Sequence, residues 1–314
     1  MIKILELFGG IGSPRKALIN LGIEHKCIDY VEIDEKAVRT YNALFKNMYK
    51  PQSVVDYNLM PDILVHGSPC QDFSRAGKRL GGNDEDKTRS SLMFETLKII
   101  ENLGVWKPKF VIWENVKGVL DKDMIPSFHK YLSKMEELGY TNSFEVLNSM
   151  DFGIPQNRNR VYTISILGTK KFNFDKLIRV ETKHISEFLE VTKEEKYIVS
   201  QPSMLKKIPC SDKFIKNNYG CLKIIKDSCL TITTKQVRCP NAGIIKLEDN
   251  RYRYLTEREC WRLMGFEDTD YEKALREHKG TQGKLNGTLY KQAGNSIVVQ
   301  VLEAIFRELL GAFV

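Results

Sequence analysis

Apolar residues recur with two different spacings along the first half of the chain. Short runs dominated by apolar residues alternate with longer segments in which apolar residues return every three or four positions. The first spacing is typical of buried strands and the second of amphipathic helices. The expected strands are residues 2–7, 26–31, 62–66, 109–113, 142–148 and 160–167, and the expected helices are residues 14–21, 35–45, 91–103 and 126–138. This strand–helix alternation predicts a parallel, doubly wound α/β sheet.

The pattern changes after about residue 168. Residues 171–250 are rich in Lys, Thr and Asn, and their short β-like runs show no helical period. The candidate strands there are residues 197–199, 222–225, 229–233 and 243–247. Helical spacing returns at residues 255–266 and 296–310. We therefore expect a second, smaller and mostly β domain in this half of the chain.

The composition narrows the class of protein. The 314 residues suffice for two domains, and 48 Lys and Arg against 40 Asp and Glu give a net charge of +8. This balance suits a polyanionic partner but does not establish one. No apolar run reaches the roughly 18 to 20 residues of a membrane span, and the first residues predict a strand rather than a signal peptide. We expect a cytoplasmic protein without a membrane partner.

The cysteines do not form a recognisable framework. They are Cys27, Cys70, Cys210, Cys221, Cys229, Cys239 and Cys260. An odd number without a C-x-x-C pair argues against structural disulfides and against a typical zinc site. We expect no metal ion, and most of these thiols should be small buried apolar groups.

A glycine-rich turn follows the first expected strand. Phe8 to Gly12 read Phe-Gly-Gly-Ile-Gly, and Ser13 and Pro14 then suit the start of a helix. Glycines at such a place let a ligand approach the backbone at a helix N-terminus. The run does not match the G-x-G-x-x-G pattern of dinucleotide-binding proteins. Alone it is weak evidence for a ligand site.

Two carboxylates strengthen that interpretation. Glu32 follows the second expected strand, 20 residues after Gly12, where nucleotide-binding α/β folds place an acid on ribose hydroxyls. Asp56 follows Val54 and Val55, where another strand end could reach an adenine edge. A solvated acid in a charged stretch remains the alternative for Glu32, and Asp56 alone does not decide the matter.

A thiol and a carboxylate follow the next two strands. Cys70 lies in the segment Gly67 to Gln71, directly after the strand at 62–66, and Glu114 comes directly after the strand at 109–113. The carboxyl ends of parallel strands face one crevice, so both groups should lie beside the glycine turn. One reaction that needs a thiol and a carboxyl group beside a cofactor is methylation of cytosine. There, a thiolate adds to C6 and makes C5 nucleophilic, and an acid at N3 takes up the developing negative charge. Burial would have to raise the pKa of Glu114 for that role.

The ordered motifs of the chain resemble those of the cytosine-C5 DNA methyltransferases. They are Phe8-Gly9-Gly10-Ile11-Gly12, Pro69-Cys70-Gln71-x-Phe73-Ser74, Glu114-Asn115-Val116, Gln156-x-Arg158-x-Arg160, Arg253-x-Leu255-Thr256-x-Arg258-Glu259, Arg262-Leu263-x-Gly265-Phe266 and Gly294-Asn295-Ser296. Each motif is weak alone, but their order and spacing over almost the whole chain are specific. The chain departs from the family at Glu257, where a proline is usual, and in a short variable region at about 169–250.

The resemblance implies a Rossmann-like methyltransferase fold and a role for individual residues. Cys70 resembles the nucleophile, Glu114 the proton donor at N3, and Arg158 and Arg160 the arginines around the cytosine. The S-adenosylmethionine pocket would include Phe8, Gly10, Gly12, Glu32, Ile33, Asp56, Pro69 and Asn295. The last helix would pack beside the first, which gives a catalytic domain of residues 1–168 and 284–314 and a target-recognition domain of residues 169–283.

Double-stranded DNA is the expected partner, since a cytosine must be flipped out of the duplex to reach Cys70. A glycine-hinged basic loop at residues 71–90 suggests a lid over DNA phosphates, against the alternative of a solvated loop. The candidate DNA contacts are Gln71, Ser74, Arg75, Lys78, Arg79, Arg89, Lys235, Gln236 and Arg238. The protein is expected to be a monomer, with a restriction endonuclease in the same system that does not contact it.

Three other functions compete with this hypothesis. A tRNA cytosine methyltransferase would share the fold, but its subgroup usually has Pro-Pro-Cys-Gln and Phe-Thr, where this chain has Ser68-Pro69-Cys70-Gln71 and Phe73-Ser74. A non-catalytic DNA-binding regulator would be favoured by loss of Cys70 or Glu114, and both are present. A nicotinamide-dependent oxidoreductase lacks support because the G-x-G-x-x-G pattern is absent.

Overall fold

The computed structural model describes residues 1–55, 57–68, 92–192, 194–208 and 221–311. The strands are β1 (Ile2–Leu7), β2 (His25–Val31), β3 (Ile63–His66), β4 (Phe110–Val116), β5 (Tyr140–Asn148), β6 (Gln156–Asn157), β7 (Asn159–Leu167), β8 (Cys229–Leu230), β9 (Ile244–Lys246) and β10 (Tyr252–Tyr254). The helices are α1 (Ser13–Asn20), α2 (Glu35–Phe45), α3 (Leu92–Asn102), α4 (Ile125–Glu137), α5 (Pro202–Leu205), α7 (Glu257–Arg262), α8 (Asp268–Glu277), α9 (Gly287–Asn295) and α10 (Val299–Gly311).

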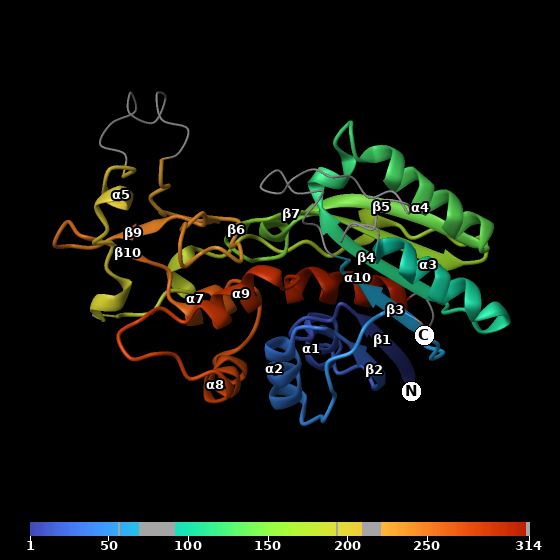
Figure 1. The fold of residues 1–314 in the computed structure, drawn as a ribbon. Coiled ribbons are helices and arrows are strands. Elements are labelled where there is room, and N and C mark those ends of the chain that lie inside the picture. Colours follow the sequence, from blue (N-terminus) through green and yellow to red (C-terminus); the bar gives the residue numbers. More distant parts are fainter. Residues whose placement is uncertain (56, 69–91, 193, 209–220, 312–314) are drawn as a thin grey trace.

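A six-stranded sheet in the order β2-β1-β3-β4-β7-β5 forms the centre of the molecule (Figure 1). The four strands from β2 to β4 are parallel, whereas β7 runs antiparallel to both β4 and β5. The expected α/β sheet is therefore present, but the expectation that it is parallel throughout is wrong. Between β5 and β7 the chain makes only a short turn and β6, without a crossover helix. A parallel return would have needed such a crossover.

Alternate residues of the sheet bury their side chains in two different layers. Ile4 of β1 faces a core that includes Leu18 of α1 and Phe306 of α10. Leu5, the next residue, faces a core that includes Phe94 of α3. α10 packs beside α1, so the two ends of the chain build one layer (Figure 1). The first core also contains Trp261 and Leu263, and it continues into the second half of the chain.

Residues 169–250 contain less regular structure than the sheet. β8 pairs with β6, and β9 pairs with β10 in an antiparallel hairpin. The runs expected as strands at 197–199 and 222–225 make only isolated bridges, Ile198 with Arg253 and Ile224 with Ile244. β10 and the polar helix α8 were not expected from the spacing of apolar residues. The strands here are too short for a period of two to stand out.

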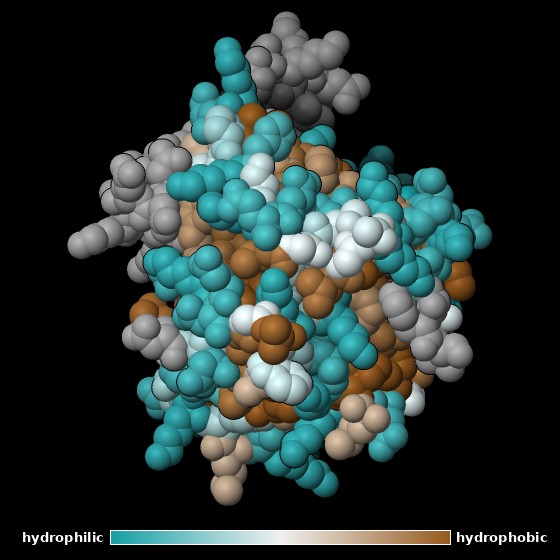
Figure 2. Space-filling view, turned by 90° about the vertical axis from the view of Figure 1, so that its right-hand side faces the viewer, coloured by the Kyte–Doolittle hydropathy of each residue, from teal (hydrophilic) through white to brown (hydrophobic). Residues whose placement is uncertain are grey.

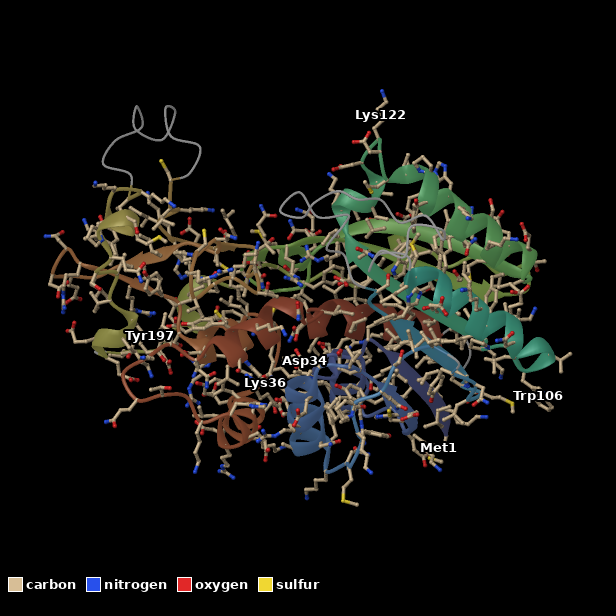
Figure 3. The ribbon with its side chains drawn as sticks, viewed as in Figure 1. Met1, Asp34, Lys36, Trp106, Lys122 and Tyr197 are labelled. Carbon is tan, nitrogen blue, oxygen red and sulfur yellow. The ribbon has the colours of Figure 1, made fainter. Side chains whose placement is uncertain are left out.

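The surface carries both hydrophobic and hydrophilic residues. Figure 2 shows hydrophobic patches between hydrophilic residues on the face turned toward the viewer. Trp106, 66% exposed, lies at the far edge of the molecule in Figure 3. Within the described ranges, no helix has both the length and the apolar character needed to cross a membrane.

Candidate active site

The carboxyl ends of β1, β3 and β4 open into one cavity together with the segment before α10. Its walls are formed by Glu6, Leu7, Phe8, Gly9, Gly10, Ile11, Ser13, Pro14, Val65, Gly67, Glu114, Asn295, Ser296 and Ile297. Side chains from the beginning, the middle and the end of the chain therefore meet where the sheet topology predicts a ligand site.

The glycine turn has the backbone conformation that its residues favour. Gly10 has a φ of 55°, and no atom lies within 4 Å of the place where a side chain would begin. A ligand can therefore come close to its backbone. Gly12 has a φ of 84° and is tightly packed, because an added Cβ would lie 2.6 Å from the Tyr41 ring. Phe8 also has a positive φ, 54°, which is unusual for a residue with a side chain.

Glu32 holds the turn and the following chain in place. One carboxylate oxygen accepts the Gly10 amide at 3.1 Å, and the other accepts the amides of Ile33 and Asp34 at 2.8 and 2.9 Å. Carboxylate oxygens can accept further hydrogen bonds, so hydroxyl groups of a ligand can still bind there. Ile33 is 76% exposed, which leaves an apolar face beside this carboxylate. Asp56, the other carboxylate expected in the pocket, lies outside the described residues.

Glu6 is a cavity residue that the sequence interpretation missed. It is fully buried, and its Oε1 accepts the Tyr41 hydroxyl at 2.6 Å. Its Oε2 is buried without a hydrogen-bond partner among the described residues. Burial raises the pKa of Glu6 to about 7, although Tyr41 and Arg15 act in the opposite direction. A lone acid in the middle of an apolar strand was the available signal, because an unpaired buried carboxyl group is costly.

Glu114 and Arg160 form an ion pair at the edge of the cavity. Arg160 Nε lies 3.1 Å from Glu114 Oε1, and both side chains are largely buried. The pair is possible because β4 and β7 are antiparallel neighbours, with Val116 opposite Arg160. Burial raises the pKa of Glu114, and the charges of Arg160 and Arg158 oppose this shift. The direction agrees with the pKa shift that a proton donor at N3 requires.

Buried hydrogen bonds join the carboxyl ends of β3 and β4. The Ser68 hydroxyl accepts the Trp113 indole N–H at 3.1 Å and the Asn115 amide at 3.5 Å. His66 contacts the Tyr131 hydroxyl at 3.0 Å, and burial lowers the pKa of His66 to about 3, so the ring is neutral. These contacts fix the chain up to residue 68 beside Glu114. An added Cβ on Gly67 would lie 3.8 Å from a Glu114 carboxylate oxygen.

Several predicted residues fall in the segment 69–91, which lies outside the described residues. They are Pro69, Cys70, Gln71, Ser74, Arg75, Lys78, Arg79 and Arg89. Their expected roles therefore stay predictions.

Arg158, directly after β6, and Asn295, at the end of α9, are two further predicted site residues. Asn295 is exposed in the cavity wall, beside the glycine turn. Arg158 is 4% exposed, and its guanidinium donates to the carbonyls of Ile232, Gly294 and Ser296 at 3.0, 3.3 and 2.7 Å. These contacts place Arg158 between segments of the protein, and a contact with the cytosine stays a prediction.

The three DNA contacts predicted near residue 236 differ in exposure. Lys235 and Arg238 are exposed on a turn after Thr234. Gln236 is 1% exposed, and its side chain accepts the Ala242 amide at 3.4 Å. The prediction that Gln236 contacts DNA is wrong for this conformation, because its side chain points into the protein and away from solvent.

The cavity and the Glu32 segment beside it carry groups that suit a cationic, nucleoside-containing ligand. In the cavity wall, Glu6 has a buried carboxyl oxygen without a partner among the described residues, and Gly10 leaves its backbone open. Ile33, which is not part of this wall, adds an exposed apolar side chain. S-adenosylmethionine combines a positive charge, ribose hydroxyls and an adenine ring that match these features. Among the residues that the structure describes, no group of three or more His, Cys, Asp or Glu could hold a metal ion.

The fold is that of the Rossmann-like methyltransferases. The crystal structure of the S. pombe Dnmt2 methyltransferase matches with a TM-score of 0.76 at 21% identity, over 100% of this chain and 99% of that chain. The Entamoeba histolytica methyltransferase EhMeth matches with a TM-score of 0.78 at 19% identity, over the same shares. At these identities the similarity establishes the architecture alone.

Sequence comparison gives the family. The model of the C-5 cytosine-specific DNA methylases matches residues 2–311. The type II methyltransferase M2.ScrFI of Lactococcus lactis subsp. cremoris is 32% identical, over 98% of this chain and 99% of the relative. The orphan methyltransferase M.SPRI of Bacillus phage SPR is 27% identical, over 100% and 98%. The chain belongs to the C-5 cytosine-specific DNA methylase family and is an enzyme of the DNA (cytosine-5)-methyltransferase class.

Proposed function

We propose that the protein flips a cytosine out of duplex DNA and methylates its C5, with Cys70 as nucleophile and Glu114 as proton donor. The observation that carries this proposal is the largely buried Glu114 carboxyl group. It has a raised pKa, is paired with Arg160, and shares one cavity with the glycine turn. A carboxyl group whose pKa is raised beside a cofactor pocket can donate a proton to a base as negative charge develops on that base.

The reaction divides between Cys70, Glu114 and Arg160. The Cys70 thiolate forms a bond to C6 while Glu114 gives a proton to N3, which leaves an electron-rich C5. When bound, S-adenosylmethionine would supply an electrophilic methyl group to C5 and would leave as S-adenosylhomocysteine. A base then removes the C5 proton, the C6–S bond breaks, and N3 returns its proton to Glu114. The positive charge of Arg160 stabilises the Glu114 carboxylate after it has given up its proton.

Glu6, Gly10 and Glu32 would hold the cofactor. The Glu6 carboxyl group would pair with its positive charge, the Gly10 backbone would leave room for its chain, and Glu32 would accept ribose hydroxyls. Ile33 would pack against the adenine, while Asp56 and Pro69 complete the pocket only as predictions.

The charge distribution supports DNA as the substrate. Residues 169–250 carry 16 of the 48 Lys and Arg but only 10 of the 40 Asp and Glu. This quarter of the chain therefore holds most of the net positive charge, and DNA phosphates attract such a region. Flipping a base costs a few kcal/mol, which contacts of this region must offset. We propose that the enzyme acts as a monomer and that a restriction endonuclease of the same system does not contact it.

Methylation of a plasmid library followed by bisulfite sequencing tests the proposal. The wild type should methylate cytosine in one short sequence context, and Cys70→Ala should reduce the signal to background while DNA binding stays measurable. DNA that carries 5-fluorocytosine in that context should form a covalent adduct with the wild type, because fluorine at C5 cannot leave as a proton. Methylation of tRNA with inert duplex DNA would instead favour the RNA-modifying alternative.

A further inference from the structure

Arg158 joins two parts of the protein that are far apart in the sequence. Its guanidinium donates to Ile232 in the segment 231–238, which we call the recognition turn, and to Gly294 and Ser296 on either side of Asn295. The Arg158 side chain is 4% exposed, so these contacts are shielded from water. Charge-assisted hydrogen bonds in such surroundings are strong and directional.

Two further contacts bring the same segments together. Gln156 is fully buried, and its Oε1 accepts the Ile232 amide at 3.0 Å while its Nε2 donates to the Leu263 carbonyl at 2.8 Å. Gly294 packs directly on the backbone of the recognition turn. A Cβ added to Gly294 would lie 2.5 Å from the Thr233 carbonyl carbon, so any other residue there must push the turn away.

The two joined segments belong to different proposed binding sites. The recognition turn exposes Lys235 and Arg238, while Asn295 and Ser296 line the cavity that holds the glycine turn. A shift of the recognition turn would change the hydrogen bonds of Arg158 and the packing of Gly294, and both changes reach Asn295. Close packing and buried hydrogen bonds transmit such a shift well, because neither can stretch without cost.

We propose that Arg158 is a positioning residue that couples DNA binding at the recognition turn to cofactor binding at residues 294–296. The proposal rests on the proposed function, since it needs both ligands. It gives Arg158 a different role from the contact with cytosine that the family resemblance implies. Coupling between two sites is reciprocal, so DNA should tighten cofactor binding by the same factor as cofactor tightens DNA binding.

The difference between arginine and lysine explains why Arg158→Lys should lose the coupling. Arginine presents five N–H donors in a planar fork and can reach three carbonyls at once, whereas a lysine ammonium cannot span them. Lysine would keep the positive charge that acts on Glu114. Arg158→Lys therefore separates the bridging role from a purely electrostatic one.

Calorimetric binding of S-adenosylhomocysteine, with and without duplex DNA of the mapped sequence, measures the coupling. The wild-type ratio of dissociation constants should lie in the range of about 5 to 150. Arg158→Lys and Gly294→Ala should each bring this ratio close to 1 and raise the KM for cofactor more than they lower kcat. Arg160→Lys should instead lower kcat and keep the ratio.

Two matched controls separate the coupling from general damage. Gly287→Ala lies in the same helix as Gly294, where the added Cβ would meet a Val237 carbon at an ordinary 3.7 Å. Arg179→Lys changes an arginine of an exposed ion pair with Glu145. Both controls should keep the wild-type ratio.

Three results would overturn the proposal. The first is a wild-type ratio near 1 in an enzyme that methylates DNA, which leaves the proposed function standing. The second is a wild-type ratio in folded Arg158→Lys, and the third is a wild-type ratio in Gly294→Ala. If the wild type methylates no DNA at all, the proposed function itself fails first.

Discussion

The cavity edge of the sheet and the region that carries the recognition turn treat buried acids in opposite ways. At the cavity edge, Glu6 has one oxygen without a partner in the described part of the chain, and burial raises the pKa of Glu6 and of Glu114. In α7, which belongs to the second region, Glu259 is fully buried. It accepts two N–H groups of Arg253 and the amides of Thr256 and Glu190. Glu257 likewise accepts the Tyr197 hydroxyl and the Asn286 amide.

This difference separates two uses of a buried charge. A fully paired acid joins segments that have little regular structure, and its removal should cost stability. An incompletely paired acid is a cost that the protein tolerates where a ligand completes the pairing. The first kind should therefore respond to mutation in unfolding experiments, and the second kind in rates and pH profiles.

The largest expected effect concerns Glu114. Glu114→Gln removes the proton donor but keeps the shape of the side chain, so kcat should fall by about 10²- to 10⁴-fold. The wild-type rate should fall as pH rises through the raised pKa of Glu114, because the donor loses its proton. Single-turnover methylation between pH 5 and 9 measures both effects. An unchanged kcat would show that Glu114 is no more than a structural partner of Arg160.

The next effect concerns the ion pair of Arg253 and Glu259, whose side chains are 5% and 0% exposed. Arg253→Met leaves a buried carboxylate without its cation and should cost about 3–5 kcal/mol of stability. Arg251→Met, which removes an exposed arginine paired with Asp249 and Glu195, should change the denaturation midpoint little. Urea unfolding of both variants tests the contrast. If the two variants unfold at the same urea concentration, the buried ion pair contributes no more to stability than the exposed one.

The sequence predicted the first of these regions far better than the second. In the sheet, apolar spacing located β1, α2, β3 and α4 to within about two residues, because long periodic elements bury one face. It could not predict that β7 runs antiparallel to β4, since spacing carries no direction. Glu114 was singled out because it directly follows the apolar run at 109–113, although β4 itself continues through Glu114 to Val116.

The second region depends on contacts that spacing does not report. Gln156, Arg158 and Arg253 join distant segments through single side chains, and these partners come together only in the folded chain. Glu257, which replaces a proline usual in the family, is buried and accepts the Tyr197 hydroxyl and the Asn286 amide, and neither partner could be read from the sequence. Gln236 was predicted to contact DNA because nothing in the sequence of a polar turn indicates that one of its polar residues is buried.

A smaller effect should appear in the stability of the protein through Glu6. The folded-state pKa is raised to about 7, above the ordinary value of 4.5. The folded protein therefore holds a proton that the unfolded chain has lost, and stability falls as pH rises from 4.5 to 7. The loss amounts to about 3 kcal/mol. Glu6→Gln keeps the acceptor for Tyr41 and cannot ionise, so the variant should lose less stability over this range.

Chemical denaturation at pH 5 and pH 8 measures this difference. Glu24→Gln, at an exposed position, should follow the wild-type pH dependence. A cationic ligand that completes the pairing of Glu6 should remove part of the penalty, so a saturating concentration of S-adenosylmethionine should stabilise the wild type more at pH 8 than at pH 5. If Glu6→Gln and the wild type lose equal stability between the two pH values, Glu6 does not carry an unpaired charge.

The smallest effect should come from the exposed charges of the recognition turn. Lys235→Ala and Arg238→Ala should each lower the slope of log K against log salt for DNA binding by about 1, because one phosphate contact is lost. Lys26→Ala, in the edge strand β2, should leave the slope unchanged. The free energy of unfolding should stay at the wild-type value in all three variants, because exposed lysines and arginines contribute little to stability. If the Lys26 and Lys235 variants change the slope equally, the overall positive charge of the protein attracts DNA and no particular segment contacts it. A slope that changes only for the turn would place the DNA on the segment that Arg158 holds.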